Sequence, residues 1–117
     1  MRANRRAVLG AGALGLLAAP SLRAQETFPN RPIRIVVPYP PGAINDMLGR
    51  WIADKLPEVL GQPGLVENRA GAAGNIGTAH VAQSAPDGYT IGIGNTPILA
   101  VNPFVYNNMG YDTRTGI

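Results

Sequence analysis

The folded part of this chain is expected to open on a short buried β-strand that stops abruptly. Residues 33–37 read Ile-Arg-Ile-Val-Val, almost entirely β-branched, and prolines stand on both sides, at Pro32 and Pro38. Such runs bounded by turn residues are typical of buried strands, and proline cannot donate a ladder hydrogen bond. The sequence Pro38-Tyr39-Pro40-Pro41-Gly42 therefore predicts a strand over 33–37 that ends in a stiff turn.

A helix is predicted directly after this turn, because apolar residues recur there four positions apart and form one stripe. We expect Asn45 or Asp46 to cap its start and Gly61 to close it. Pro57 is expected to kink the helix or end it about one turn early. The stripe is expected to face a sheet, and it consists of Met47, Leu48, Trp51, Ile52, Leu56, Val59 and Leu60.

The following elements alternate between strand and helix. A strand is expected around 65–67, a small-residue helix over 75–85 after the glycine-rich stretch 71–77, and a third strand over 89–94. The order strand, helix, strand, helix, strand predicts an α/β fold with a parallel sheet. We expect residues 25–100 to form part of a first α/β domain and residues 101–117 to begin a crossover to a second domain that is missing.

The first 24 residues resemble a cleavable signal peptide. They contain Arg2, Arg5, Arg6 and Arg23 and no acidic residue, and an apolar run over 7–19 follows the first three arginines. This run is shorter than the roughly 20 residues that span a bilayer, so no stable membrane insertion is expected. Paired arginines before a weakly hydrophobic core favour a twin-arginine signal and export to the periplasm, with an ordinary secretory leader as the alternative.

The leader also accounts for the positive charge. The whole chain carries a net charge of +3, with 10 basic and 7 acidic residues. Four of the basic residues belong to residues 1–24, so the exported part would be close to neutral, which gives no indication of nucleic-acid binding. The sequence contains no cysteine, and this excludes disulfides and thiolate chemistry.

Three loops are candidates for ligand binding, because open parallel sheets bind ligands beyond the carboxyl ends of their strands. They are the stretches 41–46, 71–77 and 95–97, each rich in Gly, Asn or Thr. Backbone N–H groups at such strand-to-helix turns favour a carboxylate or a phosphate. The alternative is that these stretches are only tight turns.

Catalysis finds little support in the sequence. Gly71, Gly74 and Gly77 resemble a dinucleotide-binding variant, but the stricter motif spaces its glycines differently and needs an acidic residue after the next strand. A Rossmann-like oxidoreductase fragment therefore stays an alternative. His80 is the single histidine, Ser84 lacks a nucleophile-elbow context, and no metal-ligand spacing occurs. We expect no enzyme, no cofactor and no metal.

Several motifs together resemble a known family. They are Phe28 to Pro38, Pro41-Gly42, Asp46 to Arg50, Gly61-Gln62-Pro63, Val66 to Arg69, Gly71-Ala72, Gly74 to Gly77 and Ala85 to Thr90. In this order they are similar to the N-terminal part of the Bug family, also called TctC, which comprises the periplasmic solute receptors of tripartite tricarboxylate transporters.

The resemblance implies a type II periplasmic binding protein, whose two α/β domains close on a small carboxylated solute. That solute is a di- or tricarboxylate, an amino acid or an aromatic acid, and the other partners are membrane transporter subunits. A side chain at Gly42 would obstruct the bound anion. The residues implied to bind the solute carboxylate are Pro41, Gly42, Ala43, Asn45, Asp46, Asn95 and Thr96.

The chain departs from the family pattern in three respects. Ala43 stands where a second glycine is usual, Pro57 interrupts a helix that is normally unbroken, and family members are much longer. We therefore expect a truncated receptor with an incomplete fold. A remnant without binding activity is a further alternative.

Overall fold

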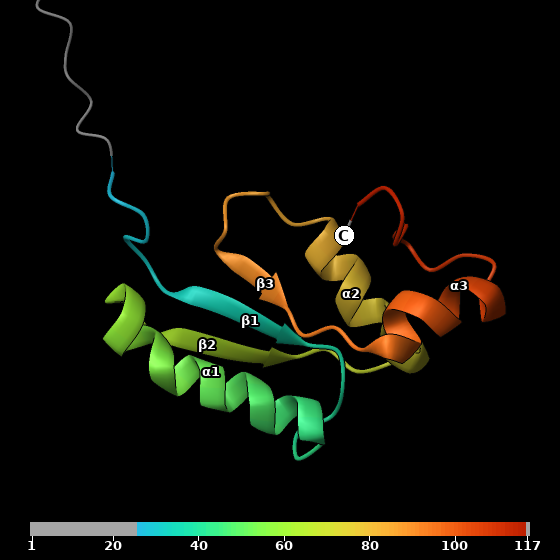
Figure 1. Ribbon diagram of the computed structural model, residues 1–117, viewed down its shortest axis with the longest axis horizontal. Coiled ribbons are helices and arrows are strands. Elements are labelled where there is room, and N and C mark those ends of the chain that lie inside the picture. Colours follow the sequence, from blue (N-terminus) through green and yellow to red (C-terminus); the bar gives the residue numbers. More distant parts are fainter. Residues whose placement is uncertain (1–25, 117) are drawn as a thin grey trace, which may run out of the picture.

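The computed structural model describes residues 26–116, so the predicted leader over 1–24 lies outside the described part. The chain alternates between strands and helices before it reaches a short helical stretch (Figure 1). The elements are β1 (Ile33–Val37), α1 (Ile44–Leu60), β2 (Gly64–Asn68), the 3₁₀ turn η1 (Ala72–Gly74), α2 (Asn75–Ala82), β3 (Thr90–Gly92), the π-helical η2 (Pro97–Val101) and α3 (Asn102–Val105).

The three strands form one parallel sheet in the order β2-β1-β3, which confirms the predicted α/β fold class. β1 is central and pairs with β2 from Ile33–Gly64 to Val37–Asn68, and with β3 from Arg34–Thr90 to Val36–Gly92. Since alternate residues of a strand point to opposite faces, the two helices α1 and α2 can cover β1 from both sides (Figure 1).

The core between the sheet and α1 consists of few side chains. Ile35, Val37 and Ile93 are buried there, and Ile52, Ala53 and Leu56 of α1 pack against them with Tyr39 and Val66. The opposite face of β1 is also buried, at Val36, whose neighbour Gly92 on β3 lies against Val81 of α2. Both faces of the central strand are therefore covered, as expected for a parallel sheet.

The prediction that the apolar stripe of α1 faces the sheet was largely wrong. Met47 and Trp51 are each 62% exposed and Val59 is 75% exposed. The helix approaches the sheet through small residues instead, because a Cβ on Gly49 would lie 2.7 Å from Cγ2 of Val37. This close approach turns most of the large side chains away from the sheet, and only Ile52 and Leu56 of the stripe pack against the core.

The predicted boundaries of α1 were right at one end only. Gly61 closes the helix in the left-handed conformation (φ +72°), and its N–H donates to the carbonyl oxygen of Pro57. Pro57 was expected to kink the helix or to end it early, and the early end does not occur, because the helix continues through Pro57 to Leu60. Pro57 lies one turn from the end, where a missing N–H removes a single helical hydrogen bond.

The start of α1 also differs from the prediction. The helix begins at Ile44, and the cap position is Ala43, which makes no side-chain capping hydrogen bond. Neither Asn45 nor Asp46 is therefore the cap residue. Asp46 lies in the first turn, where its carboxylate accepts the N–H of Gly42 from the preceding loop.

The second half of the fold is held by α2 and the segment that follows α3. α2 and β3 are both shorter than predicted, and residues 106–116 return along α2, where a Cβ on Gly110 would lie 3.0 Å from Cβ of Ala79. The hydroxyl of Tyr111 donates to Oδ1 of Asn75. Among the helices of residues 26–116, none has the length and apolar character needed to cross a bilayer.

Candidate functional site

Three loops leave the carboxyl ends of the strands and lie at one edge of the sheet. They span residues 38–43 after β1, 69–74 after β2 and 93–96 after β3. Because the strands are parallel, the loops emerge on the same side (Figure 1). Ligands of open α/β sheets bind at this side. The predicted anion-binding residues lie in the first loop, in the first turn of α1 and in the third loop.

Tyr39 connects these loops. Its hydroxyl accepts a 2.8 Å hydrogen bond from Nδ2 of Asn95 in the loop after β3, and its carbonyl oxygen accepts a 3.1 Å hydrogen bond from Nδ2 of Asn68, the last residue of β2. Gly74 lies against the same hydroxyl, because a Cβ there would be 3.3 Å from it. The side chain thus fixes the loops after β1, β2 and β3 relative to one another.

Asp46 fixes the loop after β1 from the helix side. Its side chain is buried, with 3% of the residue exposed. Oδ2 accepts hydrogen bonds from the N–H of Gly42 at 2.9 Å and from Nε of Arg50 at 3.0 Å, and Oδ1 accepts one from Nδ2 of Asn68 at 2.8 Å. The carboxylate is therefore fully engaged in bonds within the chain.

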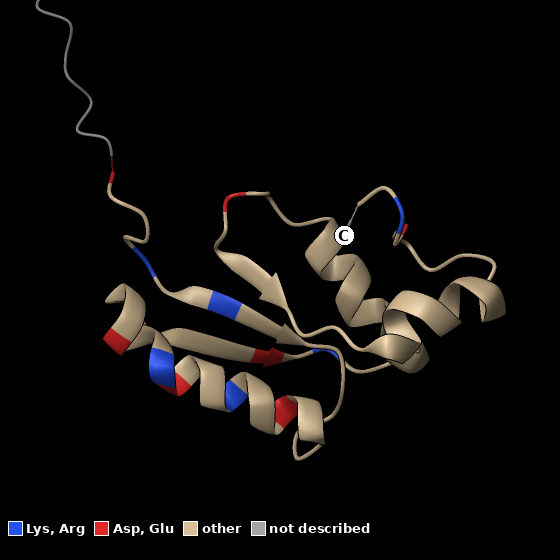
Figure 2. Cartoon of the chain, viewed as in Figure 1, with Lys and Arg blue, Asp and Glu red and all other residues tan. Residues whose placement is uncertain are grey.

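The electrostatics of Asp46 follow from these donors. The hydrogen bond from Arg50 lowers the pKa of Asp46 most. The hydrogen bonds from the backbone N–H of Gly42 and from the amide of Asn68 lower it further, to about 2. The group is ionised at neutral pH, and the adjacent guanidinium of Arg50 compensates its charge. Charged residues alternate in sign along α1, whereas α2 and α3 carry none (Figure 2). An anion near the first loop therefore does not face an uncompensated carboxylate.

The predicted donors of the first loop divide into engaged and free groups. The N–H of Gly42 donates to Asp46, and the N–H of Ala43 donates to the carbonyl oxygen of Pro40 at 3.3 Å. Pro41 has no N–H to offer. The N–H groups of Ile44 and Asn45, at the start of α1, have no acceptor within residues 26–116.

The predicted donors of the third loop divide in the same way. Both ends of the Asn95 amide are engaged, since Nδ2 donates to Tyr39 and Oδ1 accepts the N–H of Ile98 at 3.2 Å. Thr96 is exposed, and no described residue forms a hydrogen bond with its hydroxyl. The structure thus joins Asn95 to the first loop through Tyr39 and leaves Thr96 available beside it.

Two residues that organise the site were missed by sequence reasoning. The sequence indicates Tyr39 only as part of a proline-rich turn and Asn68 only as part of a family motif. The signal for Asn68 was a polar amide at the last position of a strand, where buried polar groups normally have hydrogen-bond partners. No comparable local signal marks Tyr39, because its partner Asn95 lies 56 residues away.

The glycine-rich loop does not offer the open space that a dinucleotide needs. A Cβ on Gly74 would lie 2.8 Å from Cδ1 of Ile98, and one on Gly77 would lie 2.8 Å from both the carbonyl oxygen of Arg69 and Cα of Pro38. Neighbouring protein atoms therefore occupy the space that a side chain at Gly74 or Gly77 would need, and these glycines allow close packing. This arrangement disfavours the Rossmann-like alternative.

Neither a metal-binding cluster nor a pairing of Ser84 with a base is found in the described part of the chain. No cluster of three or more His, Asp or Glu residues lies close enough there to hold a metal ion. The hydroxyl of Ser84 donates to the carbonyl oxygen of His80 at 2.7 Å, so the pair forms a helix-terminal hydrogen bond rather than a nucleophile and base.

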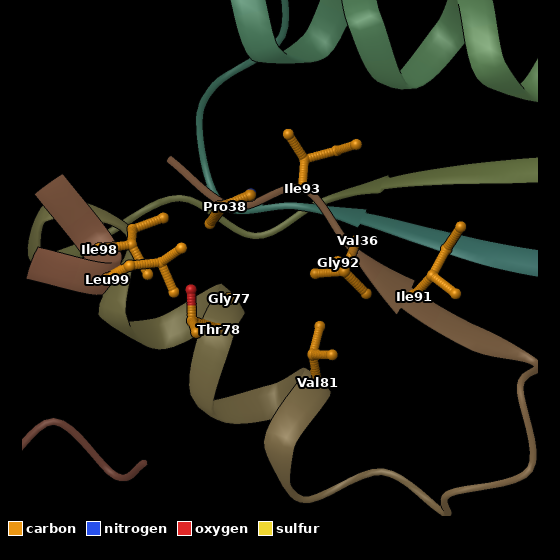
Figure 3. Close-up of a pocket in the computed structure, with 11 residues that line it drawn as sticks. Val36, Pro38, Gly77, Thr78, Val81, Ile91, Gly92, Ile93, Ile98 and Leu99 are labelled. Atoms are coloured by element: carbon orange, nitrogen blue, oxygen red, sulfur yellow. The ribbon is translucent and has the colours of Figure 1, made fainter. Parts of the chain in front are cut away.

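An apolar cavity of about 350 Å³ lies beside the third loop, between α2, β3 and η2 (Figure 3). Thr78 contributes the one polar side chain among the lining residues, and its hydroxyl already donates to the carbonyl oxygen of Gly74. Figure 3 shows Val81, Ile91 and Leu99 around the remaining space. This cavity can take apolar groups but offers no side-chain donor to a carboxylate.

The sequence and the fold both match known proteins. Residues 48–117 match the family described as the tripartite tricarboxylate transporter family receptor, TctC. Protein BugT of Bordetella pertussis is 51% identical over 75 residues, which are 64% of this chain and 22% of BugT. This chain spans about a third or less of the length of the curated relatives it matches.

Solved structures agree with this assignment. R. palustris Rpa4515 with adipate is 45% identical, with a TM-score of 0.71 over 75% of this chain and 29% of that one. MatC (Rpa3494) from Rhodopseudomonas palustris with bound malate is 32% identical, with a TM-score of 0.69 over 74% of this chain and 29% of that one.

Proposed function

This chain belongs to the TctC family of tripartite tricarboxylate transporter receptors, which are periplasmic solute-binding proteins, and we propose that its first and third loops bind one carboxylate of a small solute. The observation that carries the proposal is a set of free donors at the start of α1 and on the third loop, which Tyr39 connects to the loop that precedes α1. These donors are the N–H groups of Ile44 and Asn45 and the hydroxyl of Thr96.

In this proposal the remaining predicted site residues hold the two loops in place and keep the space above the first loop open. Asp46 holds the N–H of Gly42 and so shapes the loop, while Asn95 links that loop to β3. Gly42 has φ +90°, and a Cβ at this position would meet no atom within 4 Å, so the space above the loop is open to a ligand. A helix N-terminus with free N–H groups attracts an anion.

The solute class and the location complete the proposal. Similar proteins hold adipate and malate, which are both small dicarboxylates. We infer a di- or tricarboxylate, an amino acid or an aromatic acid as the solute, transporter subunits in the membrane as partners, and the periplasm as the location. The twin-arginine-type leader over residues 1–24 would deliver the chain there.

A titration of the isotopically labelled chain tests the site. Adipate and malate should shift the amide resonances of Ile44, Asn45 and Thr96 in ¹H–¹⁵N spectra. The variant Thr96→Val should weaken binding about tenfold, the effect of one hydrogen bond to a charged group. Thr90→Val, at the other end of β3, is the matched control and should bind normally.

Two results would contradict the proposal. One is the absence of any shift with either dicarboxylate, which would favour a remnant without binding activity. The other is a response of residues 71–77 to NADP, which would favour the Rossmann-like alternative.

Gly42→Val should abolish the dicarboxylate response, because a β-branched residue is strained at positive φ and its side chain would occupy the open space.

A further inference from the structure

The edge strand β3 forms few backbone contacts with the rest of the sheet. It spans three residues, two of them exposed, and in the described sheet it pairs with β1 alone. The ladder lies between two hydrogen bonds, from the N–H of Arg34 to the carbonyl oxygen of Tyr89 at 2.8 Å and from the N–H of Ile93 to the carbonyl oxygen of Val36 at 3.0 Å. A short edge element of this kind is expected to open locally more easily than the central strand.

The segment that precedes β1, residues 28–31, wraps around Tyr89, the residue before β3. We call this segment the arm. The ring of Phe28 packs edge-on against the ring of Tyr89, with 5.0 Å between the centroids, and the guanidinium carbon of Arg31 lies 4.1 Å from the Tyr89 centroid. The Tyr89 hydroxyl accepts the N–H of Asn30 at 2.9 Å and donates to Oδ1 of Asn30 at 2.8 Å. Three of the four arm residues therefore contact this one side chain.

The turn before β3 is shaped to receive the arm. Asp87 uses both carboxylate oxygens, since Oδ1 accepts the N–H of Tyr89 at 3.0 Å and Oδ2 accepts Nη2 of Arg31 at 3.1 Å. Gly88 lies against the ring of Phe28, because a Cβ at this position would be 3.1 Å from Cζ of that ring. The arm and the turn thus meet through an ion pair, a cation–π contact and a close glycine contact.

These contacts connect β1 and β3 a second time, outside the ladder. The arm is continuous with β1 through Pro32, and it enters the sheet at the end where the parallel strand β3 begins (Figure 1). Asn30 and Tyr89 are 59 residues apart, so their contact forms only in the folded chain. Each exposed contact is weak alone, since exposed ion pairs and cation–π contacts contribute little. Together they hold Tyr89 beside the start of β1.

We propose that the arm is a clasp that holds the edge strand β3 in the sheet, rather than a linker between the leader and the fold. Because release of β3 as a whole requires the contacts with Tyr89 to break, the clasp makes local opening of this strand rarer. The clasp also limits processing of the chain. This consequence rests on the proposed export, since removal of the leader over 1–24 has to leave residues 28–31 on the chain.

Hydrogen exchange of the labelled full chain, measured without solute, tests the clasp. The amide of Ile93 reports opening of the β1–β3 ladder, and the amide of Arg69, which donates to the carbonyl oxygen of Val37 at 2.8 Å, reports opening next to β2. Tyr89→Phe keeps the ring but removes both hydrogen bonds to Asn30. It should speed exchange at Ile93 about two- to tenfold and leave exchange at Arg69 unchanged.

A second substitution tests the cation of the arm. Arg31→Gln removes the guanidinium from the Tyr89 ring and should speed exchange at Ile93 about two- to fivefold. Lys55→Gln is its matched control, because it also removes an exposed cation from a surface ion pair but lies on α1, and it should leave exchange at Ile93 unchanged. An equal effect of these two substitutions on Ile93 would contradict the clasp.

Asn68→Ala separates a local effect on β3 from a general loss of stability. It removes hydrogen bonds on the β2 side of β1, so it should speed exchange at Arg69 more than at Ile93. Opposite changes of the Ile93 to Arg69 rate ratio in Tyr89→Phe and Asn68→Ala support the clasp. The proposal is overturned if both substitutions change this ratio in the same way or leave it unchanged.

The processed chain gives an independent check. N-terminal sequencing of the periplasmic protein should place its first residue at or before Phe28. A protein that begins after Arg31 and still protects Ile93 as well as the full chain does would overturn the clasp. Because the exchange rates are measured without solute, failure of the clasp is visible separately from failure of the carboxylate site.

Discussion

Asn68 donates a 2.8 Å hydrogen bond from Nδ2 to Oδ1 of Asp46, and this contact joins the last residue of β2 to the first turn of α1. The same nitrogen donates to the carbonyl oxygen of Tyr39. One amide thus connects the second strand, the loop after the first strand and the helix whose start is proposed to bind the solute.

Removing this amide should destabilise the fold. Asn68→Ala leaves the carbonyl oxygen of Tyr39 and one oxygen of Asp46 without their donor, and we expect the free energy of unfolding to fall by about 1–3 kcal/mol. Urea denaturation measures the change. Asn107→Ala, at an exposed residue for which no hydrogen bond is found in the described part of the chain, should change stability by less than about 0.5 kcal/mol. Equal effects of the two substitutions would refute the connecting role of Asn68.

The stability of the fold should depend on acid pH through Asp46. Arg50, the N–H of Gly42 and the amide of Asn68 hold the folded-state pKa of Asp46 at about 2, whereas an unfolded Asp titrates near 3.9. The contribution of its ionised form is therefore present above about pH 4 and is lost as the pH falls toward 2.

Comparison with Asp46→Asn isolates this contribution, because all other groups titrate in both proteins. The stability difference between the two should be constant near neutral pH and should shrink between about pH 4 and pH 2. Chemical denaturation at a series of pH values measures it. A difference that grows as the pH falls would show that the carboxylate is not stabilised by its donors.

The link between the first and third loops should depend on one hydroxyl group. Tyr39→Phe removes the acceptor of the Asn95 amide, and we expect a loss of about 0.5–1.5 kcal/mol in the free energy of unfolding together with weaker dicarboxylate binding. Tyr106→Phe is the control, since no described group bonds to its hydroxyl. Calorimetric unfolding and the titration described above measure both effects. Unchanged binding in Tyr39→Phe would separate Tyr39 from the site.

Gly74 and Gly61 form a matched pair for close packing. Both have positive φ, at +91° and +72°, so alanine is strained at either position by about 1–2 kcal/mol. A Cβ on Gly74 would in addition lie 2.8 Å from Cδ1 of Ile98, whereas a Cβ on Gly61 meets no atom within 4 Å. Gly74→Ala should therefore lose about 1–3 kcal/mol more stability than Gly61→Ala. Equal losses in thermal unfolding would mean that backbone strain alone requires glycine at position 74.

The export route can be tested independently of binding. Replacing Arg5 and Arg6 together by lysine should block periplasmic accumulation if the leader is of the twin-arginine type, because that route reads the arginine pair. Replacing Arg2 and Arg23 by lysine is the matched control. Cell fractionation with an epitope tag measures location, and unchanged export of the Arg5/Arg6 variant would indicate the general secretory route.

The sequence by itself determined the elements and their order. The β-branched run between Pro32 and Pro38, the stop at Gly61 and the alternation of strand and helix follow from preferences of short segments, and the parallel α/β class follows from their order. The similarity to TctC receptors is likewise a property of the sequence, since residues 48–117 match that family.

Only the tertiary structure decided which surfaces meet. It turned the small residues of α1, rather than Met47 and Trp51, toward the sheet, because Gly49 permits a closer approach than a large side chain would. It also drew Asp46 into a buried network with Asn68 and joined Tyr39 to Asn95. These partners lie 22 and 56 residues apart, and no local preference encodes a contact that forms only when the strands take the order β2-β1-β3.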